Sequence, residues 1–228
     1  AIAILLGLEA TRRAVGLSMA LIAAAFIAYA CAGPWLPGLL SHKGFSWERI
    51  IYHLYLFQEG IYGLPLGVAA TYVFVFVLFG AFLEKTGAGS FFMNLAYALT
   101  GRARGGPAKA AVLGSALMGS ISGSAIANVV TTGVFTIPMM KRVGYQPHEA
   151  GGIEAAASTG GQVLPPVMGA GAFLMAELTG VPYWEIAKIS FIPALMYFAV
   201  VFLFVDILAR RRGLSGLSRE EIPDWRKV

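Results

Sequence analysis

Long apolar stretches recur along this chain, separated by short polar segments that hold most of its charges. Five stretches lack Asp, Glu, Lys and Arg, the last of them being shorter than the others: 14–42, 60–83, 110–140, 155–176 and 189–205. A helix that crosses a bilayer needs about 20 mainly apolar residues. The pattern therefore predicts uninterrupted transmembrane helices at 15–33, 63–83 and 184–208.

The composition supports a membrane protein and argues against a soluble or disordered chain. Of the 228 residues, 57% are apolar and only 13% are charged, against about 25% charged in a typical soluble domain. The net charge of +5 does not indicate nucleic-acid binding, because the basic residues stand between apolar runs, as they do in cytoplasmic loops. We therefore expect an all-α integral membrane protein with no nucleic-acid partner.

The distribution of basic residues predicts that 107–141 enters the membrane and returns to the same side. With the basic clusters in the cytoplasm, the chain runs out, in, out and in along these segments: 15–33, 63–83, 148–178 and 184–208. The segment 107–141 must then begin and end in the cytoplasm, which one straight helix cannot do. Its middle, 119–124, reads GSISGS, a sequence that breaks helices. We predict a re-entrant hairpin with arms at 107–119 and 127–140 and an unwound tip between them.

The segment 148–178 carries a second interruption. Its middle contains Gly160-Gly161 and Pro165-Pro166, and a proline disfavours helical geometry at and before its own position. We expect an unwound stretch at 159–166, which makes 148–178 a discontinuous helix. Unpaired backbone is not tolerated against lipid, so tip and break predict a site of the kind secondary transporters build from broken helices. The alternative is that the glycines only permit close packing and the prolines only kink a helix.

Several polar residues near these interruptions are candidates for binding. Free carbonyls and hydroxyls suit a small cation, and half-helix N-termini favour an anionic group. Glu154, one turn before Ser158, is a candidate for attracting the coupling ion or for protonation, and the alternative is that it reaches water at the cytoplasmic boundary. Asp206, one turn before Arg210, is expected to form an interfacial ion pair.

Other segments suggest surface helices and argue against catalysis. The apolar faces of 48–59 and 88–100 predict helices that lie along the membrane, with ordinary packed connecting helices as the alternative. A single cysteine, Cys31, and widely spaced histidines give no metal-ligand spacing. The GSISG sequence has Ile121 where a nucleophile elbow needs serine. We therefore expect no enzymatic activity, although a membrane-embedded enzyme and a scaffold subunit without a site remain as alternatives.

Three stretches identify a family resemblance: 60–89, 100–145 and 154–177. With the segments SISGSAIAN and STGGQVLPPVMGA at their centre, they resemble the membrane permease of tripartite ATP-independent periplasmic (TRAP) transporters, and specifically its DctM-like large subunit. The chain looks most similar to fused permeases, in which small and large membrane subunits form one chain, associated with the TAXI type of binding protein. The matching stretches cover over a third of the chain.

The resemblance implies a symport function. Such permeases take up a small organic acid delivered by a periplasmic binding protein, and a gradient of Na⁺, or of H⁺, drives the uptake without ATP. The localisation implied is the inner membrane of a bacterium or archaeon. The transport domain has two inverted repeats, each with a hairpin and a broken helix, and moves like an elevator. The alternative function is a sodium-coupled carboxylate carrier of similar architecture that works without a binding protein.

Candidate site residues follow by position from the resemblance. The sodium site would use residues of the tip and the break: Ser120, Ser122, Gly123, Asn128, Thr159, Gly160 and Gly161. The substrate site would use an overlapping set: Ser122, Ser124, Asn128, Gln162 and Pro165.

The resemblance also predicts the domain organisation. We expect 1–59 to be the end of a small-subunit-like scaffold with one transmembrane helix and an interfacial helix. Residues 60–212 would be the first repeat of the transport domain, with 213–228 as a cytoplasmic loop. Only one hairpin and one broken helix are present, so the remaining repeat of the same permease is an expected partner, and we expect this chain alone not to transport.

Overall fold

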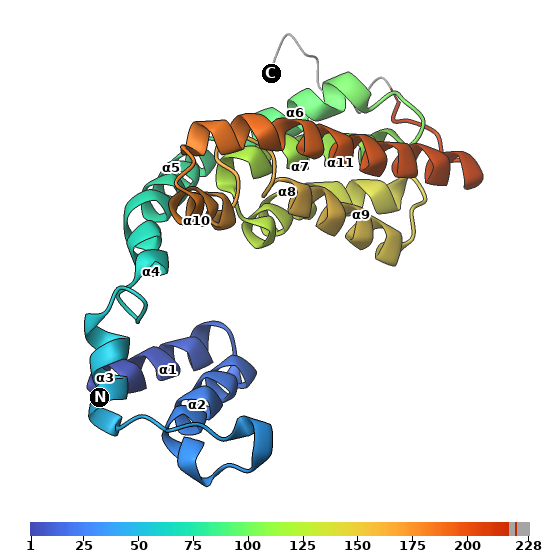
Figure 1. Ribbon diagram of the computed structural model, residues 1–228. Coiled ribbons are helices and arrows are strands. Elements are labelled where there is room, and N and C mark those ends of the chain that lie inside the picture. The colour runs from blue at the N-terminus through green and yellow to red at the C-terminus, as the bar shows by residue number, and fades with distance from the viewer. Residues whose placement is uncertain (219–221, 223–228) are drawn as a thin grey trace. The chain divides into compact units, whose positions relative to one another are not determined.

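The computed structural model describes residues 1–218 and 222, and every regular element in this part of the chain is a helix or a helical turn (Figure 1). The all-α prediction is therefore confirmed for the described residues. The chain divides into two compact units, Ala1–Ala70 and Thr71–Val228, and each unit is described by itself. Most of the loop predicted at 213–228 lies outside the described residues.

The first unit contains α1 (Ile2–Ala14), α2 (Leu17–Ala32) and α3 (Trp47–Leu56), with two short 3₁₀ turns after α2. Leu17–Trp35 is long and apolar enough to cross a membrane, as predicted for 15–33. The helix α3 covers most of the predicted surface segment 48–59, and the Ser46 hydroxyl caps it by accepting from the Arg49 N–H at 3.3 Å. Because α3 contacts both α1 and α2, it is also packed on its neighbours.

A second long apolar helix is formed by α4 (Leu64–Val68), one π turn (Ala69–Val73) and α5 (Phe74–Lys85). Together they make a 22-residue candidate span, Leu64–Lys85, in agreement with the prediction for 63–83. The division between the two compact units falls within this helix.

The second unit is built around α7 (Gly106–Ser122), which packs against α6 (Ala88–Thr100), α8 (Ala125–Arg142), α9 (Pro147–Gly160) and α11 (Tyr183–Arg211). Most residues of α7 are buried, and many are glycine, alanine or serine. Small side chains let helix backbones approach closely, which explains how one helix can contact these four and α5 as well. On α6, Met93, Ala96 and Tyr97 are the buried residues, whereas Leu99 of the predicted apolar face is exposed.

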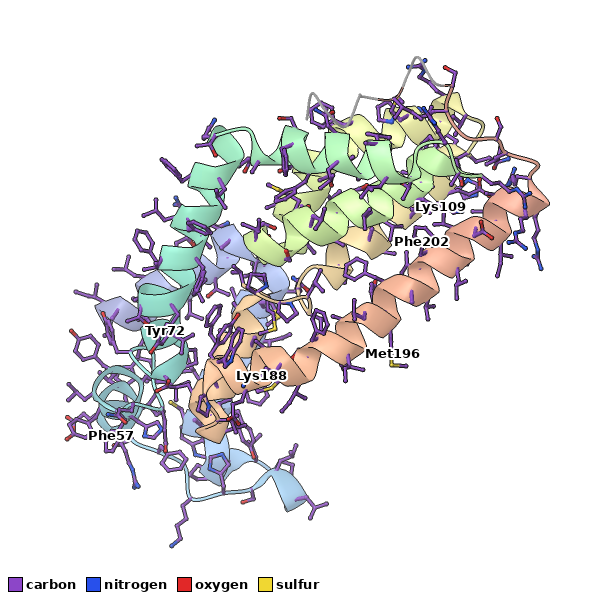
Figure 2. The ribbon with its side chains drawn as sticks, turned by 90° about the horizontal axis from the view of Figure 1, so that it is seen from above. Phe57, Tyr72, Lys109, Lys188, Met196 and Phe202 are labelled. Carbon is purple, nitrogen blue, oxygen red and sulfur yellow. The ribbon has the colours of Figure 1, made fainter. Side chains whose placement is uncertain are left out.

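The helix α11 is the third candidate span and includes the predicted segment 184–208. Its inner face buries Ala194, Phe198 and Val205, while its outer face is apolar and exposed. Met196, for example, is 65% exposed and points away from the other helices (Figure 2). Exposed apolar side chains on a helix of this length are typical of a surface that faces lipid.

The predicted tip is too long. Only Gly123 and Ser124 lie outside the helices that flank it, whereas we expected an unwound segment from 120 to 126. Two residues suffice because Gly123 adopts a left-handed conformation with φ of 63°, and its N–H donates to the Gly119 carbonyl at 2.9 Å. The Ser124 hydroxyl then caps α8 by accepting from the Ala127 N–H at 3.3 Å.

The second interruption is present but displaced from the predicted 159–166. The helix α9 ends at Gly160 and α10 (Ala170–Thr179) follows, so the break covers the nine residues 161–169 between them. A tight turn extends α9, because the N–H groups of Gly161 to Leu164 each donate to the carbonyl three residues earlier. The two prolines then stop the chain from continuing as a helix.

Candidate functional site at the hairpin tip and the helix break

The hairpin and the broken helix touch through their glycines. A Cβ built on Gly119 of α7 would stand 2.7 Å from the Cα of Gly161, at the start of the break. At the tip, a Cβ on Gly123 would collide with the carbonyl oxygen of Met168. The Val167 N–H also donates to the Ser120 carbonyl at 3.0 Å. The two interruptions predicted from the sequence therefore lie against each other.

A cavity of about 250 Å³ opens where the tip, the break and α5 meet. Its polar lining comes from Ser122 and Ser124 of the tip and Gln162 of the break. Its apolar lining comes from the π turn before α5, from α5 and α10, and from the end of the break: Val73, Phe76, Val77, Val167, Met168, Ala170 and Phe173. The cavity is therefore a small apolar space with a few convergent polar groups, as is usual for ligand sites.

Two helices begin beside this cavity. Ser124 is the N-cap of α8 and lines the cavity, and Ala170, which also lines it, is the first residue of α10. No side chain caps α10, whose N-cap is Gly169. Helix N-termini carry partial positive charge and free N–H groups. Among the described residues, no Lys, Arg or His lines the cavity, so these N-termini are its main source of positive potential.

An aromatic stack fixes the second half of the broken helix. The ring of Phe173 on α10 stacks on Tyr183 of α11 with centroids 4.4 Å apart, and it also stacks on Tyr72 with centroids 6.0 Å apart. The Tyr183 hydroxyl is 2.8 Å from the Pro166 carbonyl oxygen and also contacts the Val167 carbonyl. The break is thus held by α11 as well as by the hairpin.

The predicted site residues separate into groups. Ser122, Gly123, Ser124 and Gln162 line the cavity. Three others are buried at the contact of the hairpin with the broken helix: Ser120, Asn128 and Gly161.

The remaining three predicted residues do not line this cavity. Thr159 is exposed and donates to the Ala155 carbonyl at 2.7 Å. Gly160 packs against Tyr197 and Phe198 of α11. Pro165 is half-buried within the break.

Asn128 has an unsatisfied oxygen. Its side chain is 1% exposed, and its Nδ2 donates to the Ser115 carbonyl at 2.8 Å. Its Oδ1 accepts no hydrogen bond within the described part of the chain. A buried acceptor without a donor costs about 1–3 kcal/mol, so this oxygen is a candidate ligand for a cation.

The sequence reasoning did not place the most deeply buried charged residue. Glu154 is 0% exposed, so the alternative that it reaches water is wrong. Its Oε1 lies 2.8 Å from Ser115 Oγ, 2.5 Å from Thr132 Oγ1 and 3.1 Å from Ser158 Oγ, and its Oε2 lies 2.5 Å from Thr136 Oγ1. The signal was available in Thr132 and Thr136, which are one helical turn apart and so share one face of α8.

Ion pairs connect the end of α11 to the starts of α7 and α9. Asp206 accepts from Lys109 of α7 at 2.6 Å and pairs with Arg210 at 2.8 Å. The pair of Asp206 with Arg210 was predicted, and the partnership with Lys109 was not. The Lys109 ammonium also lies 5.3 Å from the ring centroid of Phe202 (Figure 2). Arg212 pairs with Glu149 at 2.6 Å.

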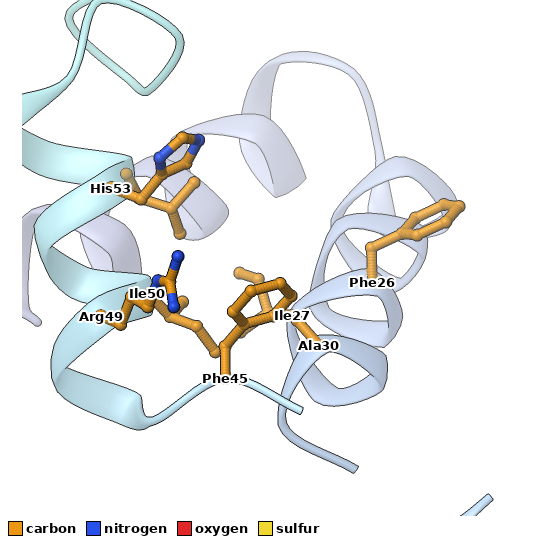
Figure 3. A pocket seen from close by; sticks show the side chains of 8 residues that line it. Phe26, Ile27, Ala30, Phe45, Arg49, Ile50 and His53 are labelled. Carbon is orange, nitrogen blue, oxygen red and sulfur yellow. The ribbon is translucent and has the colours of Figure 1, made fainter. Parts of the chain in front are cut away.

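The first unit has an unpredicted cavity of about 400 Å³ between α2 and α3 (Figure 3). Apolar side chains line it, among them Phe26 and Ile27 of α2 and Ile50 of α3, with Arg49 and His53 of α3 also present. Arg49 lies over the ring of Phe45 at 5.3 Å. None of the predicted site residues contributes to this cavity.

Comparison with known proteins gives a consistent result. The family model described as "Tripartite ATP-independent periplasmic transporter, DctM component" matches residues 2–228. The chain is 33% identical to the C4-dicarboxylate TRAP transporter large permease protein DctM of Pseudomonas aeruginosa over 150 residues. This aligned length is 66% of this chain and 35% of that protein. It is 27% identical over 155 residues to the protein of the same name from Vibrio cholerae, covering 67% of this chain and 33% of the relative.

A relative with a different named substrate also matches. The 2,3-diketo-L-gulonate TRAP transporter large permease protein YiaN of Escherichia coli is 31% identical over 91 residues, which is 40% of this chain and 21% of that protein. The chain thus spans about a third or less of the length of these relatives. Because the family model covers almost every residue, the chain belongs to the DctM component family of the TRAP transporters.

Proposed function

We propose that this chain is part of the membrane permease of an ion-gradient-driven uptake system for organic acids delivered by a periplasmic binding protein. The observation that carries the proposal is the cavity formed jointly by the hairpin tip and the helix break. Family membership supports a TRAP transporter component in a bacterial multi-pass membrane protein, and the cavity gives that component a place to bind.

The chemistry of the cavity favours a carboxylate. Ser122 and Ser124 offer hydroxyl groups, and the N-termini of α8 and α10 offer positive potential without a basic side chain. Helix N-termini bind carboxylates and phosphates in this way. The volume of about 250 Å³ suits a small acid, and the apolar walls from α5 and α10 would cover its carbon chain. The relatives named for C4-dicarboxylates and for a sugar acid are consistent with this class.

We propose Na⁺ as the coupling ion at the contact between hairpin and break, with H⁺ as the alternative. Asn128 provides a buried oxygen that lacks a donor, and Gly119 and Gly161 expose backbone beside it because they have no side chains. Oxygen ligands of this kind are suited to hard cations. The predicted residues at this contact are Ser120, Asn128 and Gly161, while Thr159 and Gly160 point toward other neighbours.

The hairpin arms suit a re-entrant role. The 17 residues of α7 and the 18 residues of α8 extend about 26 Å each at 1.5 Å per residue, so the tip can reach deep into a bilayer core of about 30 Å. In the proposed elevator, the hairpin and the broken helix move together against a scaffold. A small membrane subunit, the remaining repeat and a binding protein complete the system.

The proposal is tested by uptake into cells that express the native open reading frame together with its binding protein. Ser124→Ala removes a cavity hydroxyl and the cap of α8, so the substrate concentration for half-maximal uptake should rise about tenfold, as for the loss of a hydrogen bond to a charged group. Ser90→Ala, at an exposed position of α6, is the matched control. Equal uptake by both variants across a panel of small organic acids would contradict the assignment of the cavity.

A further inference from the structure

The carboxyl group of Glu154 sits in a closed cluster of four hydroxyl groups. Ser115 belongs to α7, Thr132 and Thr136 belong to α8, and Ser158 lies one turn after Glu154 on α9. All five side chains are buried, with exposed fractions of 0% or 1%. The cluster therefore lies where three helices pack together, and it is separate from the cavity at the tip and the break.

No cation in the described part of the chain forms an ion pair with Glu154. On α6, the titratable neighbour is Tyr97, whose pKa is raised by burial and by the charge of Glu154. On α7, Lys109 pairs with Asp206 of α11, and it lies six residues before Ser115, about 9 Å along the helix.

The other charged groups on the packed helices lie toward their ends. Lys141 and Arg142 are in the last turn of α8. Glu149 is in the first turn of α9 and pairs with Arg212, while Arg210 of α11 pairs with Asp206. A buried carboxylate without a cation is costly unless it is neutralised or fully hydrogen-bonded, and here only hydroxyl groups surround it.

The hydroxyl hydrogens can satisfy both protonation states. When Glu154 is charged, all four hydroxyls donate to its two oxygens at 2.5–3.1 Å. When it is neutral, its own proton donates to Thr132 Oγ1 or Thr136 Oγ1. The threonine then turns its hydrogen to a backbone carbonyl that is already in reach, that of Asn128 at 2.8 Å or of Thr132 at 3.1 Å. Neither state requires a heavy atom to move.

The same distances argue against a metal ion at this point. The oxygens of the cluster contact one another at hydrogen-bond lengths. A cation such as Ca²⁺ would instead sit between them at about 2.3–2.6 Å from each, which requires the oxygens to be spread apart. A proton needs no such space, so it is the ligand that this cluster fits.

We propose that Glu154 is a proton-binding site, at which one proton reversibly joins the carboxylate to form an O–H bond while the four hydroxyls reorient. The site has a route of contact to the transport site, because the Thr132 hydroxyl is within hydrogen-bond reach of both Glu154 and the Asn128 carbonyl, and the Asn128 side chain lies against Gly119. An effect of this proton on uptake rests on the proposed function. The binding of the proton to Glu154 does not depend on that function.

The test is infrared difference spectroscopy of this chain in lipid nanodiscs during a pH titration. A protonated carboxyl group has a C=O stretching band that disappears on deprotonation. We expect a band of this kind to be lost in Glu154→Gln and retained in Glu177→Gln, which removes an exposed carboxylate on α10. Because the measurement needs no transport, failure of the proposed uptake function would leave its result unchanged.

A second variant covers the case in which Glu154→Gln does not fold. Thr136→Val removes the donor to Oε2, and a charged carboxylate depends more on its donors than a neutral one. The carboxyl band should therefore change in Thr136→Val, and Thr136→Ser should restore it. Two outcomes would overturn the proposal: no titrating carboxyl band in the unsubstituted chain, or a band unaffected by either Glu154→Gln or Thr136→Val.

Discussion

Gly161 and Gly119 bring two broken segments of the chain into backbone contact: a Cβ built on Gly161 would stand 2.5 Å from the Cα of Gly119. Such a contact cannot be relieved by rotating a side chain. It places the break against the arm of the hairpin, and the shared cavity depends on that arrangement.

Substitution of Gly161 tests the importance of this contact for stability. Gly161→Ala should destabilise the fold by about 1–3 kcal/mol, as overpacking does in a well-packed core. The control is Gly151→Ala on α9, where nothing lies within 4 Å of the added atom and helix propensity favours alanine. Thermal unfolding of both variants in detergent measures the difference, and equal midpoints would show that the glycine contact is dispensable.

A second glycine separates backbone strain from steric collision. Gly123 and Gly180 both have left-handed φ angles, 63° and 69°, but only Gly123 faces a neighbour, the Met168 carbonyl. Both alanine variants pay about 1 kcal/mol for the left-handed conformation. We expect Gly123→Ala to lose considerably more stability in thermal unfolding and to abolish uptake, while Gly180→Ala keeps uptake. Equal effects would mean that the tip does not need to approach the break.

Tyr183 is predicted to hold the break in place. Tyr183→Phe removes the hydroxyl that donates to the carbonyls of the break but keeps the ring that stacks on Phe173. The expected loss is about 1 kcal/mol in the free energy of unfolding, with increased amide hydrogen exchange confined to 161–169. Tyr197→Phe, which removes a hydroxyl that donates to the Ala156 carbonyl on α9, is the matched control. Unchanged exchange in the break of Tyr183→Phe would contradict this role.

The ion pair of Lys109 with Asp206 should matter more than the neighbouring pair of Arg210 with Asp206. Lys109 is buried, whereas the Arg210 side chain is 64% exposed, and exposed pairs contribute about 0–1 kcal/mol. Lys109→Met should therefore cost about 3 kcal/mol, the lower end for a broken buried pair, because Arg210 still pairs with Asp206, and Arg210→Met should cost less than about 1 kcal/mol. Chemical denaturation of both variants measures these costs, and the reverse order would refute the assignment.

Much of the fold could be predicted because membrane helices leave a simple signal. The spans at 15–33, 63–83 and 184–208 follow from charge-free apolar length, which the bilayer imposes directly. The interruptions near Gly123 and Pro165 were also located, since glycine and proline act locally on the backbone.

The details that were missed depend on tertiary contacts. The tip is shorter than expected because Ser124 caps α8 and Gly123 closes the turn within two residues. Burial of Glu154 could not be decided from its position near a predicted boundary, because it results from hydroxyls on two other helices. Thr159 was placed in the site by the family resemblance, and in the structure it is exposed and donates to the Ala155 carbonyl.

The central claim is that the cavity of the tip and the break belongs to a transporter driven by an ion gradient. The most direct measurement is organic-acid uptake into proteoliposomes that contain the protein encoded by the native open reading frame. The binding protein, loaded with the organic acid, is added outside. We predict uptake when Na⁺ is higher outside, collapse of that uptake with a sodium ionophore, and its loss in Gly123→Ala but not in Gly180→Ala. An uptake rate that does not depend on either the Na⁺ or the H⁺ gradient, or that is unchanged in Gly123→Ala, would contradict this claim.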